Sequence, residues 1–365
     1  MNLRDATPAE LEGWDARTVD VPGGHVYQSL AWAKHRRSSG WAARHLVGDD
    51  DAAVLVLTRA WPWIGGGSAY IPRGPIAPAG GGDVAAASER LLAVSDHLAR
   101  SGIDVVASDA EIEAETGYGE RIRVAGFGPI PEIQPSRHRM SLALPAGSDD
   151  DTIRGGIGKS TRQRIKAAEG SDLTIARYDT AGWAGDGTLF DAPARPLDEV
   201  LDTFYDLLAG TGGRRGFSLG PRRLFVPWWR LAHEAGHLVH LEALDGPTPV
   251  GGLLLYRHGT RLSTVHSGDA PGARDAHPGV MHLLRWRAIQ LALREGRTEM
   301  DLGGVDTGPA HRLPGEGEPM HGLYEHKRSF GATWVEMTGA HERVIRPWRY
   351  ALGRLTARGA RTVRR

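Results

Sequence analysis

The feature that most constrains the fold is a long amphipathic helix leading into a short apolar strand, and it occurs twice. In the first half, residues 83–101 carry apolar side chains at helical spacing, Gly102 ends the helix, and the strand-like run 105–107 follows. In the second half, residues 280–295 and 299–302 repeat this order. Helices that alternate with strands indicate α/β units. We therefore expect an α/β fold that is built twice.

The two halves meet at an acidic run, Ser148-Asp149-Asp150-Asp151. A chain of 365 residues exceeds one ordinary core, which favours two domains. Strand-like runs precede the helix in both halves, at 53–58 and 69–71 and then at 238–244, 251–256 and 261–267. This common plan suggests an internal duplication, although no residue-level repeat is visible.

Composition narrows the class of protein. The sequence contains no cysteine, so disulfides and thiolate metal sites are excluded and a cytoplasmic location is expected. No apolar stretch approaches the roughly 18 residues of a membrane span, and the first residues show no secretory signal. The formal net charge is zero, which argues against nonspecific coating of nucleic acid. We expect a soluble globular protein.

The charge is nevertheless unevenly distributed along the chain. No acidic residue follows Glu342, whereas eight arginines do: Arg343, Arg346, Arg349, Arg354, Arg358, Arg361, Arg364 and Arg365. This basic C-terminus is either a solvated tail or a contact for phosphate groups, on RNA or on anionic lipid.

Lysine is rare in this chain. Only Lys34, Lys159, Lys166 and Lys327 occur, against 40 arginines. A lysine retained in an arginine-rich sequence hints at a need for a compact ammonium group close to one oxygen atom. This draws attention to Lys327, which lies between the strand-like run 299–302 with its glycine turn and the end of the second half.

Five segments, in order and spanning nearly the whole chain, carry a resemblance to one family. They are 27–34 (YQSLAWAK), 70–75 (YIPRGP), 159–169 (KSTRQRIKAAE), 301–304 (DLGG) and 323–330 (LYEHKRSF). Each is a weak signal alone. Together they resemble the FemABX-type aminoacyl-tRNA-dependent peptidyltransferases.

The resemblance implies two acetyltransferase-like (GNAT) domains, each a mixed sheet flanked by helices. The first would comprise residues 1–147 and 340–365 and bind the precursor, and the second, residues 148–339, would face the aminoacyl-tRNA. The implied reaction moves an amino acid from its tRNA ester to the amine of a peptidoglycan-precursor stem peptide, lipid-linked or UDP-linked. A cofactor-free monomer is expected in the cytoplasm, with a peripheral membrane contact through its basic C-terminus.

Aminolysis of an ester requires aligned substrates, a proton acceptor and stabilisation of an oxyanion. Lys327 matches the lysine of the family's closing signature and is our candidate cation beside the oxyanion, although His326 stands where the family has phenylalanine. Otherwise Lys327 would be a surface lysine on a strand. Asp109 follows a strand, matches an acidic position facing the acceptor, and would help remove the amine proton. It could equally be the N-cap of the turn 110–114.

The resemblance also supplies candidate substrate-binding residues: Lys34, Arg36, Arg73, Tyr70, Arg222 and Tyr324. Lys34 and Arg36 match positions that hold precursor phosphates. A further phosphate-binding arginine of the family falls near Gly220, where Arg222 could substitute. For the basic residues the alternative is a solvated basic face.

A single basic helix over residues 152–169 is expected to open the second half. Its candidate tRNA-binding residues are Lys159, Arg162, Arg164 and Lys166, with only Glu169 opposing them. Such a cluster suits the closely spaced phosphates of a tRNA acceptor end. Because no aromatic residue is interleaved, an ordinary exposed helix is the alternative.

Three other patterns point elsewhere. Residues 233–237 (HEAGH) satisfy the zinc-protease pattern, but Gly236 and a strand-like run should place the two histidines on different elements, so no metal site is expected. Residues 155–160 (GGIGKS) lack the first glycine of a phosphate-binding loop. The acetyl-CoA loop, Arg/Gln-x-x-Gly-x-Gly/Ala before a helix, has no convincing copy, which favours an aminoacyl-tRNA donor.

Three further functions stay open. The chain could be a tRNA-dependent transferase with a small-molecule amine as acceptor, or an acyl-CoA-dependent N-acyltransferase. It could also be a non-catalytic binding protein whose site has decayed.

Overall fold

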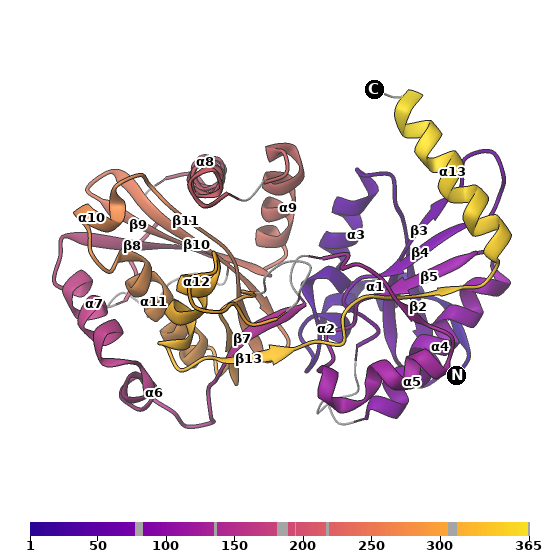
Figure 1. Cartoon of the computed structure of the whole chain (residues 1–365), viewed down its shortest axis with the longest axis horizontal. Helices are drawn as coiled ribbons and strands as arrows, with labels where there is room; N and C mark the ends of the chain where they lie inside the picture. Colours follow the sequence, from indigo (N-terminus) through magenta and orange to yellow (C-terminus); the bar gives the residue numbers. More distant parts are fainter. Residues whose placement is uncertain are drawn as a thin grey trace. The chain divides into compact units, whose positions relative to one another are not determined.

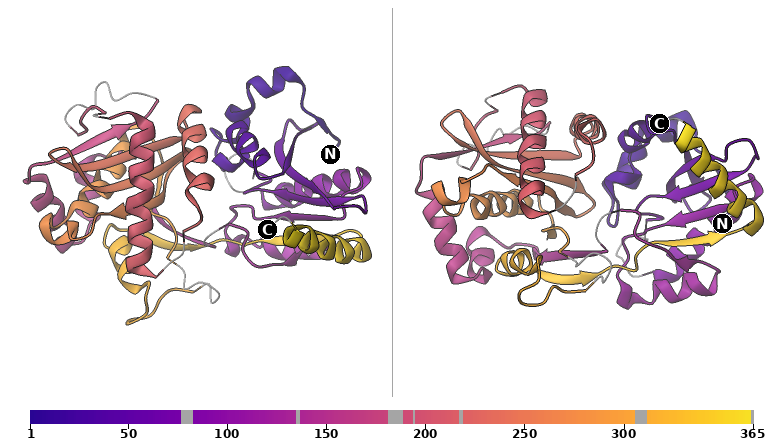
Figure 2. Two further views of the ribbon diagram at one scale, coloured as in Figure 1. Left: turned by 90° about the horizontal axis from the view of Figure 1, so that it is seen from above. Right: turned by 45° about the horizontal axis from the view of Figure 1, so that its top comes forward.

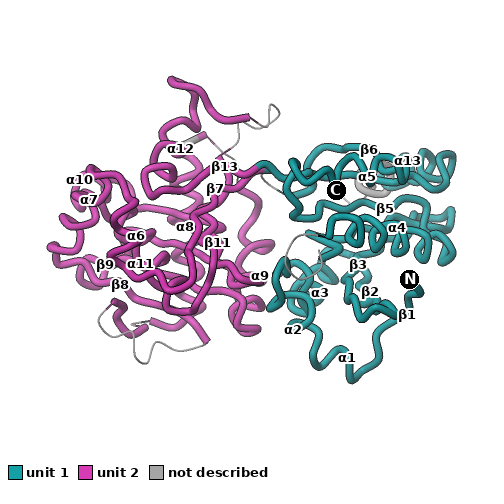
Figure 3. The backbone as a smooth tube through the Cα atoms, turned by 90° about the horizontal axis from the view of Figure 1, so that it is seen from below, with its two compact units in different colours: residues 1–137, 336–365 teal, residues 138–335 magenta. Residues whose placement is uncertain are grey.

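The computed structural model describes residues 1–76, 83–134, 137–180, 189–193, 195–216, 219–305 and 312–363. These residues form two compact units, 1–137 with 336–365, and 138–335 (Figure 3). The expected boundary at 147 follows strand β7 (His138–Ala143), whereas the unit boundary precedes it, because β7 pairs in the second sheet.

The first unit is a seven-stranded mixed sheet in the order β1-β2-β3-β4-β5-β14-β6. Its strands are β1 (Leu3–Asp5), β2 (Ala42–Gly48), β3 (Ala53–Ala60), β4 (Gly67–Ile71), β5 (Val105–Ser108), β14 (His341–Val344) and β6 (Gly128–Pro129). Its helices are α1 (Pro8–Glu12), α2 (Trp14–Thr18), α3 (Leu30–Arg37), α4 (Val84–Arg100), α5 (Tyr118–Val124) and α13 (Pro347–Val363). Figure 1 shows α4 and α5 on one side of this sheet and α3 and α13 on the other.

Strand alternation explains how both faces of this sheet become covered. Val54 and Val56 point toward α4 and pack with its Leu91 and Val94 in one core cluster. Leu55, between the two valines, points to the opposite face.

The second unit repeats the plan with the order β8-β9-β10-β11-β12-β7-β13. Its strands, besides β7, are β8 (Leu173–Tyr178), β9 (Leu238–Asp245), β10 (Thr248–His258), β11 (Arg261–Asp269), β12 (Glu299–Asp301) and β13 (Thr333–Glu336). Its helices are α6 (Asp150–Gly156), α7 (Lys159–Glu169), α8 (Leu197–Arg215), α9 (Arg222–Glu234), α10 (Ala273–Ala276), α11 (Val280–Arg294) and α12 (His321–Arg328). Figure 2 shows α8 and α9 on one side of this sheet, with α11 on the other.

The two units share one topology, which confirms the predicted fold of two α/β sheets flanked by helices. In each, the fourth and fifth strands are parallel and a long helix joins them, α4 between β4 and β5 and α11 between β11 and β12. Pairing within these couples ends at Ile71–Ser108 and at Ser263–Asp301. The open ends of the two parallel pairs hold the residues considered next.

The elements differ from the sequence-based expectation at two places. Residues 150–169 form two helices, because Ile157 and Gly158 are extended, with ψ angles of 138° and 142°. The segment around Lys327 is the helix α12 and not a strand. Within the described part of the chain, no helix is both long and apolar enough to cross a bilayer.

Candidate active site

Asp109 forms the centre of the open end of β4–β5 in the first unit. Its side chain is 1% exposed. Oδ2 accepts a hydrogen bond from the Tyr70 hydroxyl at 2.9 Å, and Oδ1 accepts one from the Arg73 backbone N–H at 2.7 Å. Both oxygens thus bind residues at the end of β4. The alternative that Asp109 is an N-cap is wrong. The next helical turn begins at Ala114, its N-cap position is Glu113, and no side chain forms a capping hydrogen bond there.

Two further residues surround this carboxylate. The Arg73 side chain is nearly buried, and its Nε lies 3.9 Å from Asp109 Oδ2 and 3.7 Å from Glu111 Oε1. Glu111 Oε1 is in turn 3.6 Å from His25 Nε2. Glu111 and His25 did not figure in the sequence-based prediction, and no motif there contains them.

Burial governs the protonation of this centre. It raises the pKa of Asp109 to about 6, against the opposing positive charge of Arg73. Burial and the Asp109 charge also raise the pKa of Tyr70 well above its usual value, so the phenol stays a donor. A carboxyl group that titrates near neutrality can accept and release a proton under physiological conditions.

Helix α3 brings Arg36 toward this centre but not Lys34. The Arg36 guanidinium stacks over Trp32, 5.3 Å from the ring centroid, and interacts electrostatically with Tyr70. Its Nε is buried and has no hydrogen-bond partner among the described residues. Lys34 is exposed on the same helix. The structure therefore gathers Tyr70, Arg36 and the Asp109 centre and leaves Lys34 in solvent.

Gln28, in the first matching segment, holds the end of β4 in place. Its Nε2 donates to the Pro72 carbonyl at 2.6 Å and to the Leu55 carbonyl at 3.3 Å, and its Oε1 accepts from the Leu55 N–H at 2.7 Å. The side-chain amide thereby connects β3 to the residue before Arg73.

The open end of β11–β12 in the second unit holds Lys327. This lysine is 4% exposed, and its Nζ donates to the carbonyl oxygens of Gly303 and Gly304, both at 2.9 Å. Gly303 has a φ of +81°, and a Cβ there would lie 3.0 Å from the Thr264 carbonyl and 3.3 Å from Nζ. Glycine is thus required at 303 for the turn and for the approach of the lysine. The alternative of a surface lysine on a strand is wrong.

Asp301 ends β12 beside this lysine. Its Oδ1 accepts from the Gly303 N–H at 2.7 Å, and Arg139 and Arg261 interact with it electrostatically. Burial raises the pKa of Asp301. Burial and the charge of Arg285 lower the pKa of Lys327 well below its usual value, while Asp301 opposes the shift.

A chain of three side chains lies beside Lys327. Arg285 Nε donates to His326 Nε2 at 2.8 Å, and His326 Nδ1 lies 3.2 Å from His282 Nε2. Because Nε2 of His326 accepts, its proton is assigned to Nδ1, which then donates to His282. Burial and the charge of Arg285 lower the pKa of His326, so the ring is neutral.

Arg285 is a site residue that the sequence-based prediction missed. It is 3% exposed, and its Nη1 is buried with no hydrogen-bond partner among the described residues. Burial lowers its pKa to about 10. The available sequence signal was an arginine within the largely apolar segment 280–293, since buried charged residues are rare unless paired.

The remaining candidates in the second unit have separate places. Tyr324 is half-buried on α12, with the Arg328 guanidinium 5.9 Å above its ring centroid. Arg222 begins α9, and it donates to Asp202 at 2.7 Å and to Asp206. Both Nη atoms of Arg222 thus donate to acidic residues of α8.

The basic helix α7 is divided in its contacts. Lys159, Arg164 and Lys166 are exposed. Arg162 instead donates through Nη1 to the carbonyls of Ile157 at 2.6 Å and Gly155 at 3.1 Å. Arg162 therefore satisfies backbone groups at the end of α6, whereas the other three cations of α7 are open to solvent.

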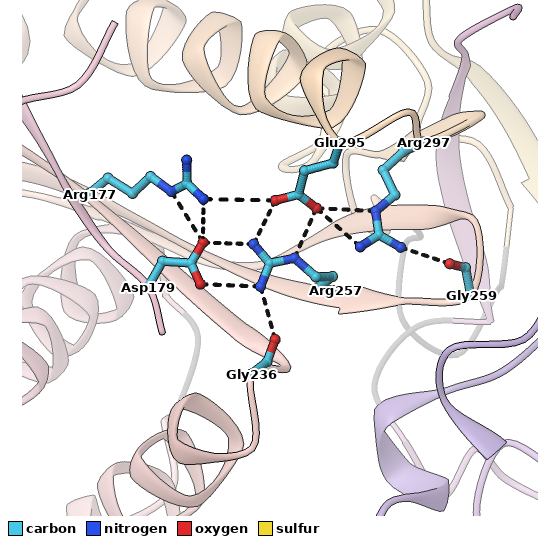
Figure 4. Close-up of polar contacts among 7 residues, drawn as sticks. All are labelled: Arg177, Asp179, Gly236, Arg257, Gly259, Glu295 and Arg297. Carbon is cyan, nitrogen blue, oxygen red and sulfur yellow. Dashed lines mark hydrogen bonds and ion pairs between the residues drawn. The ribbon is translucent and has the colours of Figure 1, made fainter. Parts of the chain in front are cut away.

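A buried ionic cluster contacts the HEAGH segment, residues 233–237, through the carbonyl of Gly236 (Figure 4). Arg257 donates to Asp179 at 2.7 Å, to Glu295 at 2.5 Å and to the Gly236 carbonyl at 2.9 Å. Arg177 and Arg297 complete the cluster. Gly236 has a φ of +78°, and α9 ends at Glu234, so the two histidines lie on different elements. Within the described residues, no group of His, Asp and Glu side chains could hold a metal ion.

The chain resembles known proteins over nearly its whole length. A family profile described as an acetyltransferase (GNAT) domain matches residues 159–328. The lipid II:glycine glycyltransferase of Staphylococcus aureus (strain USA300) is 21% identical over 401 aligned positions, which cover 93% of this chain and 92% of that protein.

Two solved structures share the fold. The crystal structure of FemX has a TM-score of 0.75 at 18% identity, covering 96% of this chain and 99% of that chain. The structure of L-PGS from Bacillus licheniformis has a TM-score of 0.52 at 13% identity, covering 97% and 98%.

Proposed function

We propose that this chain, which belongs to the FemABX family and is an acyltransferase of GNAT fold, transfers an amino acid from aminoacyl-tRNA to the amine of a peptidoglycan precursor. The proposed acceptor is the stem peptide of a lipid-linked precursor at the inner face of the membrane. The observation that carries the proposal is Lys327, buried at the open end of a parallel strand pair and held by two glycine carbonyls. The relatives named for transfer to lipid II support the acceptor.

Lys327 is suited to stabilise negative charge on an ester oxygen. When the acceptor amine attacks the ester carbonyl, the carbonyl oxygen gains negative charge and the C–N bond forms. In its ammonium form, which the neighbouring Asp301 favours, Lys327 has three N–H donors, and Gly303 and Gly304 take two of them. The third is available to the oxyanion, which a preorganised donor in a buried site stabilises strongly. Collapse then breaks the ester bond, and the ribose oxygen leaves with a proton.

The first unit would bind the precursor. We assign proton removal from the acceptor amine to Asp109, since its pKa of about 6 keeps it largely ionised at neutral pH. Arg36, with its free Nε, and Arg73 would hold precursor phosphates, with Tyr70 beside them. Lys34, exposed on α3, would meet phosphate from the solvent side. Arg222 and Tyr324 are the weaker substrate candidates, because Arg222 is already paired.

The exposed cations of α7, Lys159, Arg164 and Lys166, would bind the acceptor end of the tRNA. Their partner is a phosphate chain of high charge density, so this contact should weaken as salt rises. Arg162 would act indirectly, by holding the end of α6.

A thioester donor fits the structure less well. The acetyl-CoA loop lies ahead of a helix, and the long helix of this unit that joins its parallel strands is α11. Here a Cβ on Gly279, at the start of α11, would lie 2.2 Å from the Arg164 carbonyl oxygen. The backbone of α7 therefore lies against the helix end at which a pyrophosphate would bind.

A transfer assay tests the proposal. Wild-type protein would receive total tRNA charged with labelled amino acids, together with lipid-linked muropeptide, UDP-linked muropeptide or simple amines. We expect label in the muropeptide, lost on ribonuclease treatment of the tRNA and lost in Lys327→Ala. Arg121→Ala, an exposed change on α5, is the matched control and should retain activity.

The outcomes separate the rival functions. Transfer to simple amines but not to muropeptide would contradict the cell-wall acceptor while keeping the tRNA donor. Turnover with acyl-CoA in place of charged tRNA would contradict the donor. Partial rescue of Lys327→Ala by added methylamine would place the amine of Lys327 in the reaction and not only in folding.

A further inference from the structure

Helix α13 carries an apolar stripe that faces solvent. Trp348 is 70% exposed, Leu352 40% and Leu355 63%. The spacing i, i+4, i+7 places all three within about 60° of the helix circumference. Large apolar side chains grouped on one exposed helix face mark an interaction surface.

The opposite face fixes α13 to the first unit. A Cβ on Gly353 would lie 2.4 Å from the Trp61 ring, so the helix backbone rests directly on that indole. The Tyr350 hydroxyl donates to Glu342 at 3.0 Å. Because these contacts lie on the far side of the helix, the stripe is held outward. Figure 1 shows α13 in yellow along one side of the first sheet.

A second exposed aromatic side chain belongs to the turn that packs against α13. Trp63 is 82% exposed and has a φ of +66°, a conformation that costs free energy in a residue other than glycine. In the same turn, a Cβ on Gly66 would lie 2.4 Å from Arg349 Nη2. A strained backbone that presents a large indole to solvent indicates a role outside the unit.

The charge around these side chains is positive. Arg354 is exposed and stacks over Tyr350, 5.5 Å from the ring centroid. The acidic neighbours Asp104 and Glu342 are already engaged, by Arg346 and Arg349 and by Tyr350. No acidic residue follows Glu342 in the sequence. The stripe thus combines tryptophan and leucine with the exposed cation of Arg354.

We propose that α13 and the turn 61–66 form a lipid-docking surface for an anionic bilayer. Trp348, Leu352, Leu355 and Trp63 would enter the boundary between headgroups and acyl chains, and the arginines would contact lipid phosphates. This deepens the proposed function, since it brings the enzyme to a lipid-linked acceptor, but docking itself requires no catalysis.

Two other occupants fit these observations less well. A symmetric interface with a second copy would bring the Arg354 cations of both copies close together. An RNA partner would use the arginines and tryptophans but leave Leu352 and Leu355 without a contact, because stacking platforms are aromatic. An anionic bilayer uses both kinds of side chain.

Vesicle co-sedimentation tests the surface with the full-length protein. We expect binding to phosphatidylglycerol–phosphatidylcholine vesicles, weaker binding to pure phosphatidylcholine, and loss of the difference at high salt. Replacing Trp348 and Leu355 by serine together should lower the partition coefficient at least about tenfold. Arg354→Gln should lower it about fivefold on anionic vesicles only. Val124→Ser, at an 83%-exposed valine on α5, is the matched control and should change nothing.

Each other outcome overturns the proposal. The proposal fails if the wild-type protein does not bind anionic vesicles, or if the double serine variant binds them as strongly as wild type. It also fails if wild type is a dimer that the double variant breaks, or if the variant loses tRNA binding instead. Activity on a lipid-linked precursor in detergent solution, where no bilayer is present, should survive in the double variant, so a failure of docking is distinguishable from a failure of the proposed reaction.

Discussion

The open ends of β4–β5 and β11–β12 occupy the same place in one topology but differ in charge. In the first unit, the buried Arg73 lies between two carboxylates, Asp109 and Glu111. In the second, the buried Arg285 donates to a neutral histidine, and Lys327 donates to two carbonyls. The same fold thus holds a carboxyl group with a pKa near neutrality in the first unit. In the second unit it holds two buried cationic side chains. The topology supplies the position, and a few side chains supply the chemistry.

Substituting Lys327 tests the open end of β11–β12 and should give the largest effect on the transfer rate. Both Lys327→Arg and Lys327→Met should lower kcat by about 10²–10³, with little change in KM, because each removes a compact donor to the oxyanion. The measurement is steady-state transfer kinetics. Arg121→Met, at an exposed position on α5, is the control, and its kcat should stay near that of wild type. A Lys327→Arg variant as active as wild type would show that charge alone is needed.

Substituting Asp109 tests the open end of β4–β5. Only an ionised carboxylate accepts a proton, so the rate should rise with pH through about 6, the pKa of Asp109. Asp109→Asn should lower kcat about 10²-fold and abolish this limb of the pH profile. Asp109→Glu should keep the limb at a reduced rate. If the limb persists in Asp109→Asn, another group is the base.

The hydrogen bond between Arg285 and His326 offers a test of stability at the second open end. His326→Phe would remove the acceptor of Arg285 Nε and leave this donor unpaired, which should lower the free energy of unfolding by about 2 kcal/mol. Urea denaturation measures the change. Combining it with Arg285→Met should cost less than the sum of the single changes. Additive losses would mean that the two side chains act independently.

The smallest expected effect separates functional from structural cations on α7. Lys166→Gln should leave stability unchanged and reduce the salt dependence of tRNA binding by about one unit of slope. Arg162→Gln should instead lower the free energy of unfolding by about 1 kcal/mol, since its bonds to the α6 carbonyls are lost. Filter binding over a salt series and thermal melts measure the two. Equal salt slopes in wild type and Lys166→Gln would remove this lysine from the interface.

The fold was largely predictable because periodicity and breaker residues act locally. The helix expected at 280–295 is α11 (Val280–Arg294), and Gly236 ends α9 as its spacing indicated. Side-chain partners across the fold were harder. Asp109 was expected after a strand, but its bonds to Tyr70 and Arg73 depend on how β4 and β5 pair.

The neighbourhood of Lys327 was the least predictable part. The segment forms the helix α12, whereas the alternative for Lys327 was a surface lysine on a strand. Arg285 lies 42 residues before Lys327 in the sequence. Its hydrogen bond to His326 forms only in the folded chain. No single motif contains both residues.

Strand β14 has a consequence for the synthesis of the chain. It is an inner strand of the first sheet, paired with β5 on one side and β6 on the other, yet it comes from residues 341–344. The second sheet has all its strands once residue 336 has been made. During synthesis, the sheet of the first unit therefore lacks the strand between β5 and β6 until residues 341–344 are available. The second sheet has its last strand earlier in the sequence. A stop codon shortly before residue 341 would leave the first-made unit unfinished.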